Sequence, residues 1–209
     1  MRHINNIMDI DKILKNFQRK GYKVSYFDTA KEAAEYLNQS IDEKTVGFGD
    51  SKTLFDMKLF DLLSSHNEVI DPMHPVEGKD FNQTAKETLT TDVFLTSVNG
   101  AVTTGEMVNI DGTGNRVAGS LFGHEYAYFV FSVNKITDSI ENAVKRARQI
   151  AAPQNSQRCA EKVPCLFDGK CHDCNSPNRI CNDLMIYLHA PSYTPMSVEV
   201  VIIGEEMGV

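Results

Sequence analysis

The sequence lacks any long hydrophobic run, and it has little positive charge. Its two longest apolar stretches, near 126–133 and 198–203, have the length of β-strands and fall short of the roughly 20 residues that cross a bilayer. The chain has 21 Lys and Arg against 28 Asp and Glu, a formal net charge of −7, and no long basic block. These absences exclude a membrane-spanning role and argue against nucleic acid or an anionic membrane as a partner.

A secretion signal is also missing, because Asp9 and Asp11 stand where the apolar centre of such a signal would lie. We therefore expect a cytoplasmic protein with reduced cysteines. Cysteine is absent from most of the chain, and all five cysteines lie between Cys159 and Cys181. An odd, clustered set in a reducing compartment indicates metal binding rather than disulfides.

Several catalytic signatures are absent as well. The sequence contains no Gly-x-Ser-x-Gly elbow, no His-Glu-x-x-His and no Gly-x-x-x-x-Gly-Lys, and its six histidines show no paired spacing. Hydrolase and nucleotide-binding functions therefore have little support.

What the sequence does contain is an alternation of strand-like and helix-like segments. Apolar residues recur with helical spacing near 9–17, 33–37, 54–63, 82–89 and 143–150. Short apolar or alternating runs predict strands at 22–27, 45–48, 68–70, 92–97, 127–133, 184–188 and 198–203, with a further β-rich stretch ending at 108. This order predicts one three-layer α/β domain over 1–209 with an open, mostly parallel sheet.

Local signals fix some of the expected helix ends. Asp28 is expected to cap the helix near 33–37, and Asp138, with Glu141 three residues later, the helix near 143–150. Pro153 is expected to stop that helix. Residues 153–177 then show almost no periodicity, which predicts a small cysteine-rich lobe, residues 153–183, ordered by something other than apolar burial.

The segment 46–53, Val-Gly-Phe-Gly-Asp-Ser-Lys-Thr, is the first candidate site. Small residues where a strand leads into a helix let backbone amides approach an anion, and Ser51 and Thr53 could add hydroxyl donors. The spacing matches no dinucleotide fingerprint. The alternative is a tight turn in which Asp50 or Ser51 only caps the helix.

The segment 99–116 is the second candidate, because it combines polar side chains with small neighbours. Arg116 could hold a carboxylate or phosphate through two parallel hydrogen bonds, and Asp111 could orient Arg116 or act as an acid or base. Alternatively, Asp111 and Asn115 cap turns and Arg116 pairs at the surface. We favour the ligand interpretation because the polar residues are so dense.

Lys135 follows a predicted strand, and ligands of open α/β sheets bind at the carboxyl ends of strands. The Lys135 side chain could enter the same ligand-binding cleft as the two segments above, or it could extend into solvent. Among the histidines, His124 and His172 merit attention, the first for its place after Phe122-Gly123 and the second for its place among the cysteines.

The cysteine spacing is the most specific motif. Cys165, Cys171, Cys174 and Cys181 could wrap a tetrahedral zinc ion or an iron–sulfur cluster. The spacing matches neither a ferredoxin run nor a standard zinc ribbon, so both metals stay open. The alternative is a set of reduced, unligated thiols, with Cys159 outside the set.

Five motifs together resemble the LUD domain, the family named after the lactate utilization proteins B and C. They are Gly-Phe-Gly-Asp-Ser-Lys-Thr-Leu (47–54), Ser-Val-Asn-Gly-Ala-Val-Thr-Thr-Gly (97–105), Asn-Ile-Asp-Gly-Thr-Gly-Asn-Arg (109–116), Asn-Lys-Ile (134–136) and Ala-Ala-Pro-x-Asn (151–155). The resemblance covers nearly the whole chain and implies the fold of the NagB/RpiA/CoA-transferase group, in which a turn similar to residues 46–53 binds phosphate.

The resemblance also implies a link to the oxidation of lactate or a related small organic acid, within a multi-subunit system. It supplies no agreed catalytic residues, and the chain is too short for the twin-cluster ferredoxin module of lactate utilization protein B. The expected partners are a small anionic metabolite, other lactate-utilisation subunits and a second copy of the chain. One alternative is a zinc-stapled, non-enzymatic accessory or regulatory subunit. Another is a CoA or sugar-phosphate transferase or isomerase, for which Glu106 is the only nearby catalytic glutamate.

The residues expected to bind the anionic ligand come from the two glycine-rich segments and the strand end at Lys135. They are Gly47, Gly49, Asp50, Ser51, Asn99, Asp111, Gly112, Gly114, Asn115, Arg116 and Lys135.

Overall fold

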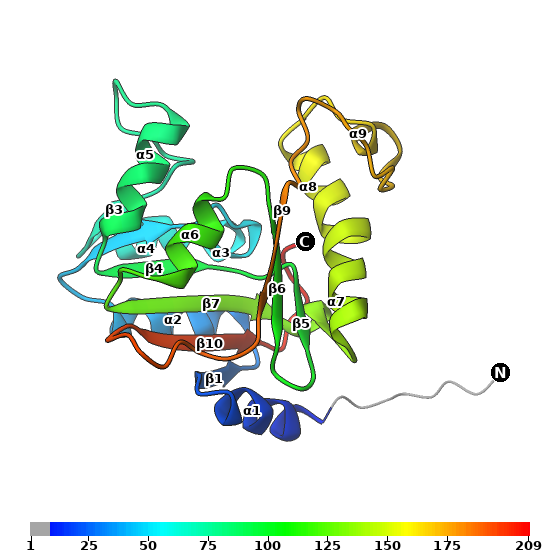
Figure 1. Cartoon of the computed structure of the whole chain (residues 1–209). Helices are drawn as coiled ribbons and strands as arrows, with labels where there is room; N and C mark the ends of the chain where they lie inside the picture. The colour runs from blue at the N-terminus through cyan, green and yellow to red at the C-terminus, as the bar shows by residue number, and fades with distance from the viewer. Residues whose placement is uncertain (1–8) are drawn as a thin grey trace.

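A six-stranded parallel sheet forms the centre of the computed structural model, which describes residues 9–209 (Figure 1). The spatial order of its strands is β1-β10-β7-β4-β2-β3. The strands are β1 (Lys23–Phe27), β2 (Thr45–Phe48), β3 (Glu68–Ile70), β4 (Val93–Thr96), β7 (Tyr126–Ser132) and β10 (Ser197–Ile203). Because every pair is parallel, the carboxyl ends of all six strands meet at one edge.

Alternating side chains of the strands bury the two faces of this sheet in separate cores. On β10, Val201 and Ile203 point into a core shared with α2 (Ala30–Ser40), α3 (Lys52–Asp56) and α4 (Leu59–Leu63). Val200 and Ile202 point the other way, into a core shared with α1 (Ile10–Arg19). This period of two on a doubly covered strand is what the apolar runs of the sequence predict.

A second, four-stranded sheet packs against the second face and crosses the first sheet in Figure 1. Its order is β8-β5-β6-β9, with β5 (Gly100–Val102) antiparallel to β6 (Met107–Asp111), β6 antiparallel to β9 (Asp183–Tyr187), and β8 (Ile136–Thr137) parallel to β5. The outer side of this sheet is covered by α7 (Ile140–Arg146) and the helical segment that follows it. The expected α/β fold with a mostly parallel sheet flanked by helices is confirmed.

The remaining helices are short. They are α5 (Phe81–Glu87), α6 (Asn115–Leu121), α8 (Ala152–Arg158) and α9 (Cys165–Asp168), with 3₁₀ turns at Thr88–Thr90 and Val133–Lys135. The helix α6 and the strand β8 are additions to the predicted elements. The helix predicted near 54–63 is divided into α3 and α4 at Lys58, whose φ of 54° is left-handed.

Two predicted helix caps are wrong by one residue. Thr29, rather than Asp28, caps α2, accepting from the amide of Glu32 while the Glu32 carboxylate accepts from the amide of Thr29. Ser139, rather than Asp138, caps α7 by accepting from the amide of Asn142 at 3.2 Å. In both cases the residue with extended backbone immediately before the first helical turn takes the role.

The prediction that Pro153 stops the helix is also wrong. The chain stays helical from α7 through a π-helical stretch (Ala147–Ala151) into α8, so residues 153–158 belong to a helix rather than to an aperiodic loop. Proline lacks an amide hydrogen and crowds the preceding turn, and a wider π turn directly before it relieves that conflict. The extension carries Arg158 toward the edge of the sheet, where the site described next is found.

None of the helices in residues 9–209 is both long and apolar enough to cross a membrane.

Candidate functional site

A cavity of about 590 Å³ lies at the carboxyl ends of β2 and β4, between α5 on one side and α8 on the other. Its wall takes in eight of the predicted ligand-binding residues, from the β2–α3 turn, the second sheet and the end of β7. They are Asp50, Ser51, Asn99, Asp111, Gly112, Asn115, Arg116 and Lys135. Gly47, Gly49 and Gly114 are outside that wall.

The two glycines of the β2–α3 turn are required by packing. A Cβ on Gly47 would lie 2.8 Å from the carbonyl oxygen of Thr88, and one on Gly49 would lie 2.9 Å from the ring of Phe94. The turn therefore needs small residues whether or not an anion approaches it. Ser51 caps α3, accepting from the amide of Leu54 at 3.4 Å, as the alternative interpretation of this motif had it.

Asp111 organises the start of α6. Its carboxylate accepts from the amides of Gly112 at 2.9 Å and of Arg116 and Val117 at 3.1 Å each. Its contact with the Arg116 side chain is longer, at 3.4 Å to Nε. Because three amides already satisfy Asp111, the Arg116 guanidinium is only partly engaged by it. Arg116 also donates from Nη2 to the carbonyl oxygen of Ile110 at 2.5 Å.

Asn99 ties the loop after β4 to the second sheet. The side-chain Oδ1 of Asn99 accepts from the backbone amide of Ile110 at 2.9 Å. The backbone amide of Asn99 donates to Oδ1 of Asn109 at 3.1 Å. Both bonds hold Asn99 in the cavity wall. Asn109, which is fully buried, was not among the predicted site residues although it lies in the quoted 109–116 motif.

Lys135 is buried, with an exposed fraction of 2%. Its Nζ donates to Oγ of Ser97 at 3.0 Å and to Oγ1 of Thr53 at 3.1 Å. Burial, followed by the positive charges of Arg146 and Arg116, lowers the pKa of Lys135 from 10.5 to about 7. A lysine at the end of a strand thus projects into the cavity rather than into solvent.

Two arginines close to the predicted residues were not themselves predicted from the sequence: Arg158 lies on the cavity wall, and Arg146 lies outside it. Arg158 of α8 donates from Nη2 to both carboxylate oxygens of Asp50, at 2.9 and 3.0 Å. Burial acts to lower the pKa of Arg158, but the bond to Asp50 outweighs it and the pKa is raised. Arg146 of α7 donates to the carbonyl oxygens of Asn99 at 2.6 Å and of Asn134 at 3.2 Å, and burial lowers its pKa.

The chain segment after β10 passes beside the same lysine. The amide of Met207 donates to Oγ of Ser132 at 3.0 Å, and Val209 lies on the cavity wall. A Cβ on Gly208 would lie 3.0 Å from Nζ of Lys135. Residues 207–209 therefore form part of the wall around the amine.

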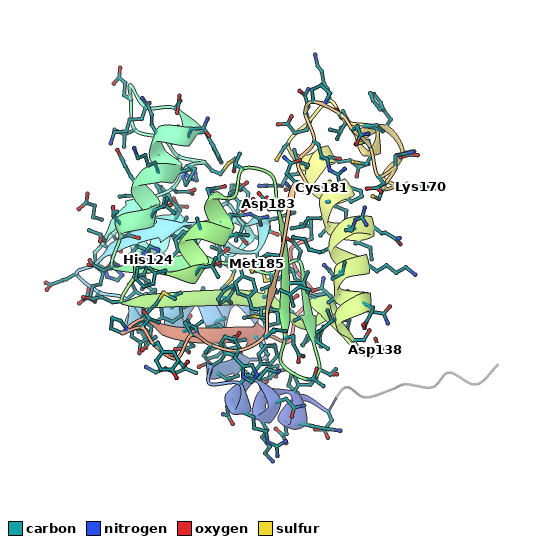
Figure 2. The ribbon with its side chains drawn as sticks, in the orientation of Figure 1. His124, Asp138, Lys170, Cys181, Asp183 and Met185 are labelled. Carbon is teal, nitrogen blue, oxygen red and sulfur yellow. The ribbon has the colours of Figure 1, made fainter. Side chains whose placement is uncertain are left out.

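Glu106 does not belong to this site. It lies between β5 and β6, where its carboxylate is 2.7 Å from Nζ of Lys20, the residue directly after α1, and it is not part of the cavity wall. The cavity therefore gives no support to the suggestion that Glu106 serves as a transferase glutamate. His124 is also remote, because it precedes β7 and so lies at the amino end of that strand, stacked on Phe94 (Figure 2).

Four of the cysteines, Cys165, Cys171, Cys174 and Cys181, lie in the segment between α8 and β9, which we call the lobe. Cys165, in α9, donates from Sγ to Oγ of Ser156 at 3.3 Å. Arg179 donates to the carbonyl oxygens of Cys174 at 2.7 Å and Cys181 at 3.0 Å, which folds the segment around one guanidinium. Figure 2 shows Cys181 at the base of the lobe, just before β9.

Cys181 lies close enough to Arg179 and to two other cysteines for their charges to act on its thiol. Burial raises the pKa of the Cys181 thiol, Arg179 acts to lower it, and the charges of Cys171 and Cys174 act to raise it further. Within residues 9–209, no group of three or more His, Cys, Asp or Glu side chains is arranged to hold a metal ion. Cys159 is separate from the others and lies on the cavity wall.

Positive charge on the cavity is not fully balanced. Asp50 is paired with Arg158, and Asp111 is in contact with Arg116. In the part of the chain that the structure describes, no Asp or Glu carboxylate lies within 4.0 Å of Lys135 or Arg146, and Arg146 donates from Nη1 to the main-chain oxygen of Val209 at 3.5 Å. A buried cation without an anionic partner is costly, so this arrangement favours an anionic ligand.

Comparison with known proteins gives a family and a fold. The family model described as "LUD domain" matches residues 10–203. No curated protein matches the chain. The crystal structure of a DUF162 family protein from Deinococcus radiodurans aligns with 93% of this chain and 95% of its own, with a TM-score of 0.51 and 13% sequence identity. At that identity the similarity is one of fold alone.

Proposed function

Because the chain belongs to the LUD domain family, we propose that it binds a small organic acid in this cavity and serves in the oxidative utilisation of lactate or a related acid. The observation that carries this proposal is Lys135, a buried amine on the cavity wall that has no Asp or Glu carboxylate within 4.0 Å among the described residues, with the half-buried Arg146 as a second positive charge nearby. A bound carboxylate would supply the missing negative charge.

Arg116 is the residue best placed to grip such a carboxylate. Its guanidinium is planar with paired donors, and its side chain is still 16% exposed. A cavity of about 590 Å³ is within the usual range for small-molecule sites and leaves space beyond a three-carbon acid.

Calorimetric titration with lactate and with pyruvate tests the proposal. We expect saturable binding to the unmodified protein and its loss in Arg116→Ala. This variant should fold, since Asp111 keeps its three backbone donors. Arg148→Ala is the matched control, because Arg148 pairs with Asp173 on the outer side of the molecule. Binding that is equal in both variants would overturn the assignment of the cavity.

The second part of the proposal concerns the cysteine-rich lobe. Cys165, Cys171, Cys174 and Cys181 would hold zinc or an iron–sulfur cluster, with Arg179 reducing the repulsion between thiolates. In favour of this proposal, the charges of Cys171 and Cys174 reach Cys181. Closure around a metal would require the Cys165 thiol to exchange its bond to Ser156 for the metal.

Metal and acid-labile sulfide analysis of protein purified without oxygen separates the alternatives. Iron with sulfide would indicate an electron-transfer role within a multi-subunit oxidising system. One zinc ion in a colourless sample would indicate a structural staple, as expected of an accessory subunit. Protein that contains neither metal would refute this second part and leave the cavity proposal standing.

A further inference from the structure

Lys135 combines three properties that rarely occur together. Its amine is buried, its hydrogen-bond partners are two hydroxyl groups, and within residues 9–209 no Asp or Glu carboxylate lies within 4.0 Å of it. A lysine that only stabilised the fold would normally extend its charge to solvent or pair it. Lys135 instead stays buried on the wall of the cavity, next to Ser97.

The same surroundings favour the uncharged amine, which is the nucleophilic form. Burial and the nearby guanidinium groups of Arg146 and Arg116 disfavour a third positive charge. Because its pKa is lowered to about 7, a large fraction of Lys135 is unprotonated at neutral pH. Desolvation and a neighbouring cation are the two established means of activating a lysine toward carbonyl groups.

We propose that Lys135 forms a Schiff base with the carbonyl carbon of a 2-oxo acid whose carboxylate is bound by Arg116. This inference rests on the proposed function, because it requires the cavity to bind a small organic acid. The carbonyl of a 2-oxo acid is directly next to its carboxylate, and Arg116 and Lys135 line the same cavity, so the proposal requires one short ligand to reach both groups. A 2-hydroxy acid such as lactate could bind in the same place but could not react.

The reaction needs no oxidant or reductant. The lone pair of Nζ attacks the carbonyl carbon, a C–N bond forms, and the oxygen takes up a proton as the nitrogen loses one. The resulting hydroxyl group then leaves as water with a second proton, and the C=N bond forms. Ser97 and Thr53, at 3.0 and 3.1 Å from Nζ, hold the amine in place and can relay these protons. Hydrolysis reverses every step and releases the free lysine.

Borohydride trapping tests the proposal on the full chain. We incubate the protein with pyruvate, add sodium borohydride to reduce the imine to a stable secondary amine, and measure the intact mass. We expect one adduct per chain, located by peptide mapping on the peptide that contains Lys135. Lactate in place of pyruvate should give no adduct, and excess lactate should suppress the adduct formed with pyruvate.

Two variants sharpen the result. Lys135→Arg keeps the positive charge but has no amine that can form an imine, so its adduct should be lost. Lys52→Arg is the matched control, because Lys52 also lines the cavity but pairs with Asp56 at 2.7 Å, and its adduct should remain. If Lys135→Arg does not fold, peptide mapping of the unmodified protein still locates the reacting lysine.

The outcomes separate this inference from the function on which it rests. Pyruvate that binds in calorimetry but yields no adduct, or yields adducts spread over surface lysines, would overturn the Schiff base and leave the acid-binding function intact. Absence of binding by both acids would overturn both.

Discussion

Replacing Lys135 by methionine should stabilise the protein at low pH and destabilise it at high pH. Methionine fills a similar volume with an unbranched chain and removes the ionisable group from the interior. Thr53 and Ser97 would lose the amine, but their hydroxyl oxygens are already 3.4 Å apart and can bond to each other. The substitution therefore isolates the free energy of placing this amine inside the protein.

The magnitude follows from the pKa of Lys135, which falls from 10.5 to about 7 on folding. Each pKa unit corresponds to about 1.4 kcal/mol, so burial of the protonated amine costs roughly 5 kcal/mol below pH 7. Against this, the two hydrogen bonds to hydroxyls are worth about 1 kcal/mol each. We expect Lys135→Met to be more stable than the unmodified protein by about 2–3 kcal/mol near pH 6.

The difference in stability between Lys135→Met and the unmodified protein changes sign as the pH rises. Above pH 7 the folded protein loses the proton of Lys135 while the unfolded chain keeps it up to 10.5. The stability of the unmodified protein therefore rises relative to the variant by about 1.4 kcal/mol per pH unit through this window. Near pH 10 the variant should be the less stable of the two.

Urea unfolding of both proteins at a series of pH values measures the difference, and all other titrating groups cancel in it. Lys52→Met serves as the control, because Lys52 is partly exposed and should show little difference at any pH. A stability difference for Lys135→Met that does not change between about pH 7 and 10 would refute the account of this lysine.

Three further predictions concern the framework and the limits of the site. Gly119→Ala should destabilise the protein by about 1–3 kcal/mol in urea unfolding, because a Cβ would lie 2.5 Å from the ring of Phe94; an unchanged midpoint would contradict that packing. Ser139→Ala should lower the free energy of unfolding by about 1 kcal/mol, because α7 loses its cap, whereas Asp138→Ala should lower it by less. A larger effect of Asp138→Ala would instead support Asp138 as the cap, as the sequence predicts. Glu106→Gln should leave calorimetric acid binding unchanged, since Glu106 is outside the cavity wall; loss of binding with the fold intact would place Glu106 in the site after all.

The strands were predictable because burial on both faces makes β4, β7 and β10 continuous apolar runs. The helix ends were less predictable. Neighbouring residues such as Asp28 and Thr29 can both cap a helix, and the backbone conformation selects between them. The path through Pro153 depends on a π turn that no local composition signal announces.

The site was predictable where it lies at the ends of strands. Asp50 and Ser51 follow β2 and Lys135 follows β7, so parallel strands deliver them to one edge, whereas the Asp111–Arg116 segment reaches the same wall from the antiparallel strand β6 of the second sheet. Arg146 and Arg158 could not be predicted, because α7 and α8 approach this edge only by packing on the second sheet, which is a long-range arrangement. The glycines at 47 and 49 suggest a ligand, yet close packing against Thr88 and Phe94 accounts for them.

Calorimetric titration of lactate in two buffers with different ionisation enthalpies tests most directly whether an organic acid binds beside Lys135. An anion next to this amine would raise its pKa, so binding near neutral pH should take up a fraction of a proton, and the measured heat should depend on the buffer. Lactate has no carbonyl, so the result does not depend on the Schiff base. Absence of binding, or a binding heat that is the same in both buffers, would contradict a cavity in which the buried Lys135 contributes to holding a small organic acid.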